Sequence, residues 1–288
     1  MAAVEFLQRG ELTLIQVHND QASASISLQG GQLLAWQPRS QAQPVIWLSR
    51  RAQFAQGKAI RGGIPLCWPW FGAHPQDAGL PAHGYARILP WQLLTKRKVA
   101  GGATEIVLAL DPEEAQSRGW TAPLRAALTL TIGEALQLAL TTHNLGADAC
   151  VVSEALHSYF QVGDVAAVRV RGLEGCQFVD KVAQGARRRQ AGALGFSGEV
   201  DRVYLATEAS CLIEDEGLQR RIRIDKSGSA STVVWSPWAD KAGKLPDLGA
   251  EGWRDMVCVE TANALDDALR LAAGASHTLS MRCTVEAL

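Results

Sequence analysis

Short runs of alternating or continuous apolar residues recur along the whole chain. In Ala135–Asn144 the apolar side chains of Leu136, Leu138 and Leu140 alternate with more polar ones, the period-two pattern of a strand that faces one layer of core. Turns rich in glycine, asparagine or charge separate the runs at the spacing typical of an all-β sandwich or barrel. The strands predicted in this way are Leu12–Val17, Ala24–Leu28, Gln32–Trp36, Val45–Leu48, Trp91–Leu94, Glu105–Leu110, Leu124–Ile132, Ala135–Asn144, Val151–Phe160, Ala167–Arg171, Arg202–Tyr204, Cys211–Asp215, Gln219–Asp225, Thr232–Ser236, Met256–Glu260 and His277–Val285.

Helical patterns are scarce. We expect short helix or turn at Pro112–Arg118, Leu248–Arg254 and Ala264–Arg270. No linker, repeat or low-complexity tract divides the chain, so residues 1–288 are expected to form one domain. A single large antiparallel β-sandwich is the simplest architecture that accounts for these patterns.

Composition indicates a globular protein with a full core. Of the 288 residues 47% are hydrophobic and 20% are charged, and the formal net charge is −1. This balance does not favour nucleic acid or a membrane as a partner. The one basic run, Arg187–Arg189, is expected to be a solvated loop or hairpin tip rather than an RNA site.

The six cysteines are scattered singly and no pair has CxxC spacing. This argues against a zinc site and favours free thiols in a reducing compartment. The N-terminus does not read as a signal peptide, and no apolar stretch reaches the roughly 18 residues of a membrane span. We therefore expect a soluble cytoplasmic protein.

The segment Ile60–Trp91 has an unusual composition. It is rich in glycine, proline and tryptophan, a mixture that forms stiff, closely shaped loops rather than long helices. Its tryptophans are most simply core residues. Arg61 and Arg87 differ, because each lies among apolar and glycine neighbours where a charge needs a partner. That partner is either an acid of the chain or an anionic ligand.

Two residues are candidates for proton transfer. His157 lies within the apolar sequence SEALHSYFQV, and Glu260 lies near the end of the apolar strand in DMVCVETAN. Such a histidine is commonly a satisfied core residue, whereas a buried carboxylate is rare unless paired. Together they are able to form an acid/base couple with pKa values set by burial. The residues alone do not establish that the two side chains meet.

Six motifs give the chain a family resemblance. In order they are RGGIPLCWPWFG, LPAHGYAR, EALHSYF, DRVY, VVWSPW and VCVETAN. This series resembles the hexose-6-phosphate mutarotases, the glucose-6-phosphate 1-epimerase branch of the aldose 1-epimerase (galactose mutarotase-like) superfamily. The resemblance extends from about Arg9 to Val285, and a tryptophan-rich RGG loop followed by HGYAR, HSYF and ETAN is a specific combination.

The resemblance implies a β-supersandwich that interconverts the α and β anomers of an aldohexose 6-phosphate. It implies that Glu260 is the base at the C1 hydroxyl and His157 the acid at the ring oxygen, so we expect an ionised Glu260 and a protonated His157. No metal or organic cofactor is expected, in agreement with the lack of metal-ligand spacings and nucleotide-binding motifs in the sequence.

The resemblance also assigns residues to the substrate. Arg61 and Arg87 match the two arginines that would clamp the phosphate, and guanidinium geometry suits such bidentate contacts. Gln53 is expected to assist them.

The sugar ring is assigned three further residues. His83 is expected to hydrogen-bond near C1 or the ring oxygen, and Asp201 to contact sugar hydroxyls or else to cap a turn. Trp238 is expected to form an apolar wall or else to pack in the core. Lys241, shortly after it, is expected to be exposed.

Other functions remain open on the sequence. A mutarotase for unphosphorylated aldoses would leave both arginines unpaired, and a non-catalytic carbohydrate-binding or sugar-phosphate-sensing protein would not need His157 and Glu260. A purely structural role would leave the site motifs unexplained. We expect a monomer, because no unusual apolar helix face is present.

Overall fold

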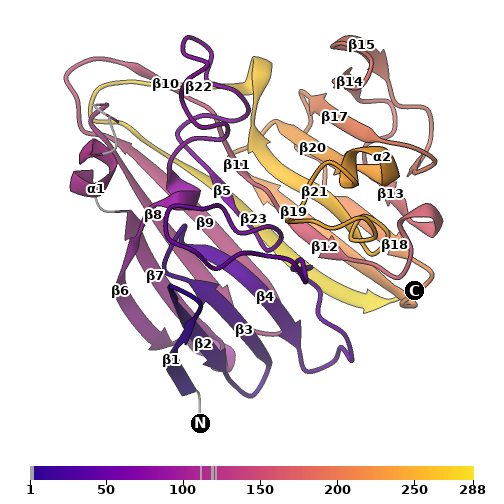
Figure 1. The fold of residues 1–288 in the computed structure, drawn as a ribbon, viewed down its shortest axis with the longest axis horizontal. Coiled ribbons are helices and arrows are strands. Elements are labelled where there is room, and N and C mark those ends of the chain that lie inside the picture. Colours follow the sequence, from indigo (N-terminus) through magenta and orange to yellow (C-terminus); the bar gives the residue numbers. More distant parts are fainter. Residues whose placement is uncertain (1–2, 111, 118–119, 121) are drawn as a thin grey trace.

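The computed structural model describes residues 3–110, 112–117, 120 and 122–288, which form mainly antiparallel β-structure (Figure 1). The N-terminal sheet has four strands in sequence order: β1 (Ala3–Arg9), β2 (Leu12–His18), β3 (Ala22–Ser27) and β4 (Gln32–Pro38). Two larger sheets hold most of the rest of the chain.

The larger of these two sheets has nine strands. In spatial order they are β16 (Leu194–Gly195), β13 (Arg169–Arg171), β18 (Cys211–Asp215), β19 (Arg220–Ser227), β23 (Ser276–Ala287), β9 (Leu136–Asn144), β8 (Leu124–Ile132), β7 (Thr104–Leu110) and β6 (Trp91–Lys98). The predicted half-buried strand is confirmed in β9, where Leu136, Leu138 and Leu140 are buried.

The other large sheet has eight strands and carries the candidate site. Its order is β15 (Ala186–Arg189), β14 (Gln177–Asp180), β17 (Val200–Leu205), β20 (Ser231–Ser236), β21 (Met256–Asn263), β11 (Glu154–Leu156) and β5 (Leu66–Cys67), and β12 (Tyr159–Gln161) also pairs with β21. A small separate ladder joins β10 (Cys150–Val152) to β22 (Leu269–Leu271).

Helices are few and short among the described residues. The α-helices are α1 (Pro112–Ser117) and α2 (Trp238–Ala242), and the 3₁₀ turns are Ala86–Ile88, Ala100–Gly102, Val165–Ala167 and Leu265–Asp267. None of the described helices has the length and apolar character needed to cross a membrane. The predicted all-β antiparallel sandwich is thus confirmed.

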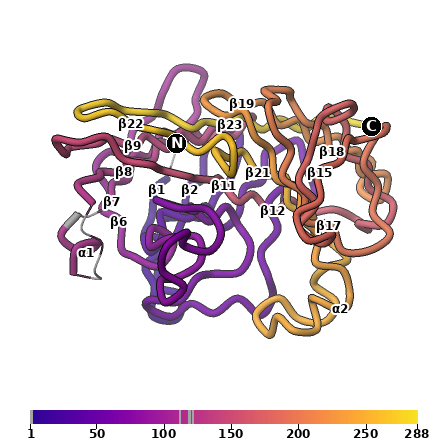
Figure 2. Tube along the Cα trace, turned by 90° about the horizontal axis from the view of Figure 1, so that it is seen from above, coloured from indigo at the N-terminus to yellow at the C-terminus, as the bar shows by residue number. Residues whose placement is uncertain are grey.

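Buried side chains between the two large sheets join them into a sandwich. Ser158, next to β12, donates a hydrogen bond from Oγ to Sδ of Met281 on β23, at 3.3 Å. The N-terminal sheet is tied to the nine-stranded sheet, because Trp36 Nε1 on β4 donates to Gly133 O just after β8, at 3.1 Å. Figure 2 shows β19 and β23 along one side of the molecule and α2 on the other, with β21 between them.

Several predicted elements differ from the observed ones. Val45–Leu48 makes only isolated bridges, of which two join Ile46 to Phe160 and Leu48 to Gly62, because it runs between sheets. Val151–Phe160 is not one strand but parts of β10, β11 and β12.

The short helix or turn predicted at Ala264–Arg270 is present as a 3₁₀ turn at Leu265–Asp267, but the end of this range enters β22. The basic run Arg187–Arg189 is neither loop nor hairpin tip but part of the exposed edge strand β15, which pairs with β14. The six cysteines are all free.

Candidate active site

A pocket of about 290 Å³ lies against the outer face of the eight-stranded sheet and collects most of the predicted site residues. Its lining includes His157, Glu260, His83, Arg61, Arg87 and Asp201. These residues come from three strands or strand ends and from the glycine- and proline-rich segment. The fold therefore brings the separate sequence motifs to one place.

Strand register brings His157 and Glu260 together. Leu156 pairs with Thr261, and Tyr159 pairs with Cys258, so the antiparallel register is the same on both sides of His157. That register sets His157 opposite Glu260, although residues 157 and 158 themselves form a break between β11 and β12. Directly opposed residues on neighbouring strands project to the same face of a sheet.

The break between β11 and β12 determines the contacts of His157. Its backbone N–H donates to Pro65 O at 3.0 Å, outside the regular ladder. Ser158 points to β23, so His157 points to the outer face. The imidazole stacks on the Tyr159 ring, with centroids 4.9 Å apart and planes 7° apart, and Trp235 meets it edge-on at 6.1 Å. These aromatic contacts fix the ring plane.

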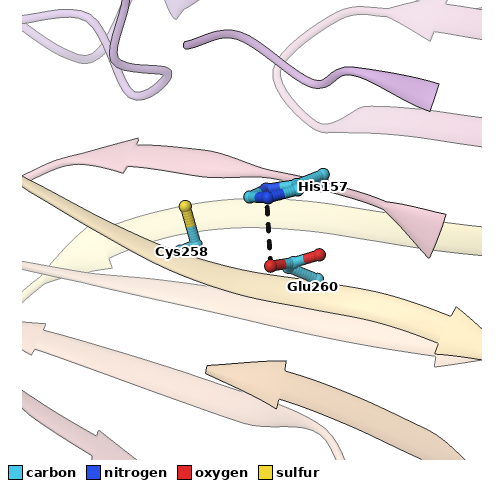
Figure 3. Close-up of side chains that lie close together, drawn as sticks. All are labelled: His157, Cys258 and Glu260. Carbon is cyan, nitrogen blue, oxygen red and sulfur yellow. Dashed lines mark ion pairs between the residues drawn. The ribbon is translucent and has the colours of Figure 1, made fainter. Parts of the chain in front are cut away.

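The two candidate catalytic groups lie close without a hydrogen bond. His157 Nδ1 is 3.4 Å from Glu260 Oε1, and the side chains are 12% and 1% exposed (Figure 3). His157 Nδ1 and Glu260 Oε2 are both buried and have no hydrogen-bond partner among the described residues. Buried polar atoms without partners are costly, and they mark places where a ligand supplies the missing contact.

Burial dominates the electrostatics of this pair. Desolvation, together with the nearby His83, Arg61 and Arg87, lowers the pKa of His157 well below its usual value. Desolvation also raises the pKa of Glu260 well above its usual value, although Lys181 opposes the shift. The pocket by itself thus favours a neutral imidazole and a protonated carboxyl group, which differs from the charged pair expected from the sequence.

His83 is held by an unusual loop conformation. Its φ is +66°, and its backbone N–H donates to Gly72 O at 2.6 Å. Its Nδ1 accepts a hydrogen bond from Gly72 N at 3.3 Å, and burial followed by nearby cations lowers its pKa to about 3. The neutral ring therefore carries its proton on Nε2, which leaves a hydrogen-bond donor for a ligand.

Arg61 is anchored on two sides. Its Nε and Nη2 contact the two carboxylate oxygens of Asp247 at 3.1 and 3.3 Å, and its Nη1 donates to Tyr159 Oη at 3.0 Å. These three bonds use three of the five guanidinium N–H groups. The sequence left open whether the partner of this arginine is an acid or a ligand, and the structure supplies an acid while two donors remain.

Arg87 makes fewer hydrogen bonds than Arg61. Its Nη2 donates to Ala82 O at 2.6 Å, whereas its Nε is buried and has no hydrogen-bond partner in the part of the chain that the structure describes. Both arginines line the pocket with two lysines, Lys181 and Lys241. The pocket thus offers four basic side chains to an anionic ligand, beside the acidic side chains of Asp201 and Glu260.

Acidic residues balance the two lysines. Lys181 Nζ lies 3.8 Å from Asp201 Oδ1 and 4.8 Å from the centre of the Phe71 ring. Lys241 Nζ contacts Glu199 Oε1 at 2.5 Å. Asp201 is on β17 and lines the pocket; burial, its largest influence, raises its pKa.

Two predicted substrate residues are not among those that line the pocket. Gln53 is exposed, and Trp238 lies at the start of α2, where its ring packs on Trp253 with centroids 4.5 Å apart. Trp68 and Trp70 are buried, as expected of core residues.

Sequence reasoning missed several pocket residues. Trp235 lines the pocket in place of Trp238, from the same VVWSPW motif. In the structure Val233 and Trp235 pair with Glu260 and Cys258 and so share their face, but the sequence STVVWS of β20 does not alternate and gave no signal for this. Lys181 likewise carried no signal, and Lys241, expected only to be exposed, also contributes to the lining.

Comparisons with known proteins place the chain in a family. The family model described as aldose 1-epimerase matches residues 13–284. The chain is 38% identical over 255 residues to a protein of Escherichia coli K12 named "Putative glucose-6-phosphate 1-epimerase", covering 88% of this chain and 84% of the relative. A relative of the same name from Salmonella typhimurium is 38% identical over 258 residues, covering 89% and 85%.

Solved structures show the same fold. A crystal structure titled as a putative mutarotase (YeaD) from Salmonella typhimurium superimposes with a TM-score of 0.92 at 34% identity, covering 99% of this chain and 94% of that one. The structure of HI1317 gives a TM-score of 0.81 at 27% identity, covering 98% and 96%. The family match spans most of the chain, and the chain belongs to the aldose 1-epimerase family of isomerases.

Proposed function

We propose that this chain is a glucose-6-phosphate 1-epimerase, an enzyme that interconverts the α and β anomers of a hexose 6-phosphate. One observation carries the proposal: the facing pair His157 and Glu260 shares a pocket with the cationic side chains of Arg61, Arg87, Lys181 and Lys241. The names of the 38%-identical relatives support the same substrate class.

The reaction needs one base and one acid. In our proposal Glu260 removes the proton of the C1 hydroxyl while His157 donates a proton to the ring oxygen, and the C1–O5 bond breaks to give the open-chain aldehyde. Rotation about C1–C2 and reclosure with the roles reversed give the other anomer. Each positioned proton transfer typically contributes about 10²- to 10⁴-fold in rate.

The proton balance of the pair suits this scheme. The neutral pair that burial favours and the imidazolium–carboxylate pair hold the same number of protons and differ by one transfer between the two groups. A bound phosphate would offset the positive charge of Arg61 and Arg87, which contributes to the low pKa of His157. Substrate binding would therefore favour the imidazolium that protonates the ring oxygen.

The basic side chains of the pocket explain why we propose a phosphate ester as the substrate. Arg87 has a buried Nε without a partner, and Arg61 retains two N–H donors beside its carboxylate anchor. Charge-assisted contacts of this kind are roughly twice as strong as neutral hydrogen bonds. A neutral aldose would leave these donors and charges unmatched, which favours the phosphate ester over an unphosphorylated sugar.

Three other properties belong to the proposal. We infer that the enzyme acts as a monomer of one domain. The six free cysteines support a reducing compartment such as the cytoplasm. The reaction itself calls for no metal or organic cofactor.

Exchange NMR on the anomeric protons of glucose 6-phosphate tests the function, with glucose measured in parallel. The wild type should accelerate exchange of the phosphate ester and act weakly or not at all on glucose. His157→Asn and Glu260→Gln should each lose about 10²-fold or more of the acceleration. Arg187→Gln, which removes an exposed arginine that pairs with Asp266, is the matched control and should retain it.

Two outcomes would redirect the assignment. Binding of glucose 6-phosphate with exchange at the buffer rate would indicate a non-catalytic sugar-phosphate-binding protein. Equal acceleration for glucose and its phosphate ester would indicate a general aldose mutarotase.

A further inference from the structure

A third side chain joins the catalytic pair on the same face of the sheet. Cys258 lies two residues before Glu260 on β21, and Figure 3 shows both projecting to the side of His157. One ligand atom from each of His157, Cys258 and Glu260 can be chosen so that all three lie within 4.8 Å of one another. The set is an imidazole nitrogen, a thiol sulfur and a carboxylate oxygen.

This donor set matches the preferences of zinc. Zinc in proteins takes cysteine sulfur, histidine nitrogen and carboxylate oxygen, and sites with three protein ligands keep a fourth position open. Softer thiolate and imidazole donors also discriminate against magnesium and calcium.

The spacing also fits a tetrahedral ion. Ligand atoms that bind such an ion at roughly 2.0–2.3 Å lie about 3.3–3.8 Å from one another. His157 Nδ1 and Glu260 Oε1 are already 3.4 Å apart, a separation too long for a strong hydrogen bond between them. The thiol would need a shift of at most roughly 1–1.5 Å, which a side-chain adjustment supplies.

Two unpartnered atoms point to the same conclusion. His157 Nδ1 and Glu260 Oε2 are buried without hydrogen-bond partners, and the Glu260 side chain is only 1% exposed. A cation bound between the two side chains would supply a partner to His157 Nδ1 and to one oxygen of the Glu260 carboxylate. It can reach them through the pocket, because His157 and Glu260 line it.

We propose that His157, Cys258 and Glu260 form a binding site for a zinc-class divalent cation and that the bound cation reversibly blocks the enzyme. The ion takes the lone pair of the imidazole and the oxygen of the carboxylate, so neither group remains free to move a proton. The open coordination position faces the pocket, so substrate and cation exclude one another. Binding does not depend on the proposed function, whereas the inhibition does.

Cobalt(II) is the probe for binding, because it occupies zinc sites and its complexes with thiolates absorb strongly in the near ultraviolet. The wild type should develop this charge-transfer band with one equivalent of cobalt, and excess zinc should abolish it. Cys258→Ala should lose the band and bind zinc, measured by calorimetry, more weakly by at least the roughly 10- to 100-fold that loss of an outer-shell partner costs.

Cys67→Ala is the matched control. Cys67 is also fully buried, on β5 of the same sheet, but it is not part of the three-residue cluster. This variant should keep the band and the zinc affinity of the wild type. A wild type without the thiolate band, or a Cys258→Ala variant that binds zinc as the wild type does, overturns the proposal. The absence of the thiolate band is read from the wild type alone, so this outcome does not depend on whether a variant folds.

Inhibition is measured separately by anomer exchange. Zinc should abolish the acceleration in the wild type, a chelator should restore it, and Cys258→Ala should need at least about tenfold more zinc for the same loss. An active enzyme without the cobalt band disproves the cation site alone. A cobalt band in a protein that leaves exchange at the buffer rate disproves the proposed function alone.

Discussion

We expect single charges to decide which ligand the pocket accepts. Arg87 is the better position for testing this, because Arg61 is tied to Asp247 and Tyr159 and its loss would leave a carboxylate unpaired. Arg87 makes one hydrogen bond to a backbone carbonyl and keeps a buried N–H group without a partner. Its removal therefore affects ligand binding more than the surrounding structure.

We expect Arg87→Gln to raise KM for glucose 6-phosphate by roughly 10- to 100-fold, the equivalent of one lost charge-assisted contact, with a smaller change in kcat. Exchange NMR at several substrate concentrations separates the two constants. Any residual activity on glucose should stay unchanged. An equal loss with both sugars would show that Arg87 does not recognise the phosphate.

A second buried carboxyl group lies behind the pocket. Glu154 on β11 is fully buried, accepts a hydrogen bond from Thr142 Oγ1 at 2.8 Å, and lies 3.8 Å from His277 Nε2. Burial raises its pKa from 4.5 to about 8. The native protein therefore keeps this proton over a pH range in which the unfolded chain has lost it.

This difference predicts a pH-dependent stability. Between pH 4.5 and about 8 the unfolded state binds fewer protons at this site, so the free energy of unfolding should fall as pH rises, by of the order of a few kcal/mol, and level off above pH 8. Glu154→Gln should flatten this part of the profile. Thermal midpoints of the wild type and of Glu154→Gln, measured from about pH 5 to about pH 9, check this prediction. Two profiles that run parallel would refute it.

At the scale of elements, the loop that holds His83 depends on a close backbone approach. Gly84 has φ +74°, and a Cβ at this position would lie 2.0 Å from Trp68 O. Gly57 has a similar φ of +71°, but a Cβ there would meet nothing within 4 Å. The two glycines separate the effect of backbone strain from that of steric overlap.

Gly84→Ala should therefore lower the thermal midpoint more than Gly57→Ala. The strain of a left-handed alanine costs about 1–2 kcal/mol in both variants, and the overlap adds to it only at position 84. Gly84→Ala should also lose mutarotase activity, because displacement of the loop moves His83. Differential scanning calorimetry and exchange NMR check the two effects, and equal midpoints would show that the loop relaxes freely.

Elements with a clear period were predictable, whereas their partners were not. The alternation in residues 136–140 was enough to define β9, and the two-residue break at His157 was hidden because SEALHSYFQV is apolar on both sides of it. The facing of His157 and Glu260 depends on strand register over a long sequence separation, which no local pattern encodes. For the same reason the sequence pointed to Trp238 instead of Trp235 and did not indicate Lys181.

At the scale of the whole molecule, most of the core lies away from the pocket. The main buried cluster draws on all three sheets, including Ile26 on β3 and Leu128 on β8, whereas the pocket lies on the outer face of the eight-stranded sheet. Leu128 on β8 is fully buried in that core, whereas Leu94 on β6 is 58% exposed.

Leu128→Ala should reduce the free energy of unfolding by about 2–5 kcal/mol and leave kcat unchanged below the unfolding transition. Leu94→Ala is the exposed control and should change the stability by less than about 0.5 kcal/mol. Urea unfolding and exchange NMR measure the two properties. A loss of kcat in well-folded Leu128→Ala would show that the core layer couples to the pocket.

The facing of His157 and Glu260 on neighbouring strands has a consequence for how such enzymes diversify. The spacing of the two proton carriers is set by the register of the sheet, while Arg61, His83 and Arg87 belong to the segment Ile60–Trp91, whose strand β5 lies at one edge of the same sheet. The residues proposed to move protons and the residues proposed to select the substrate therefore lie in separate stretches of the sequence. Exchanging the segment Ile60–Trp91 between relatives should therefore change which sugar is preferred. The spacing of His157 and Glu260 should stay as it is in the recipient protein.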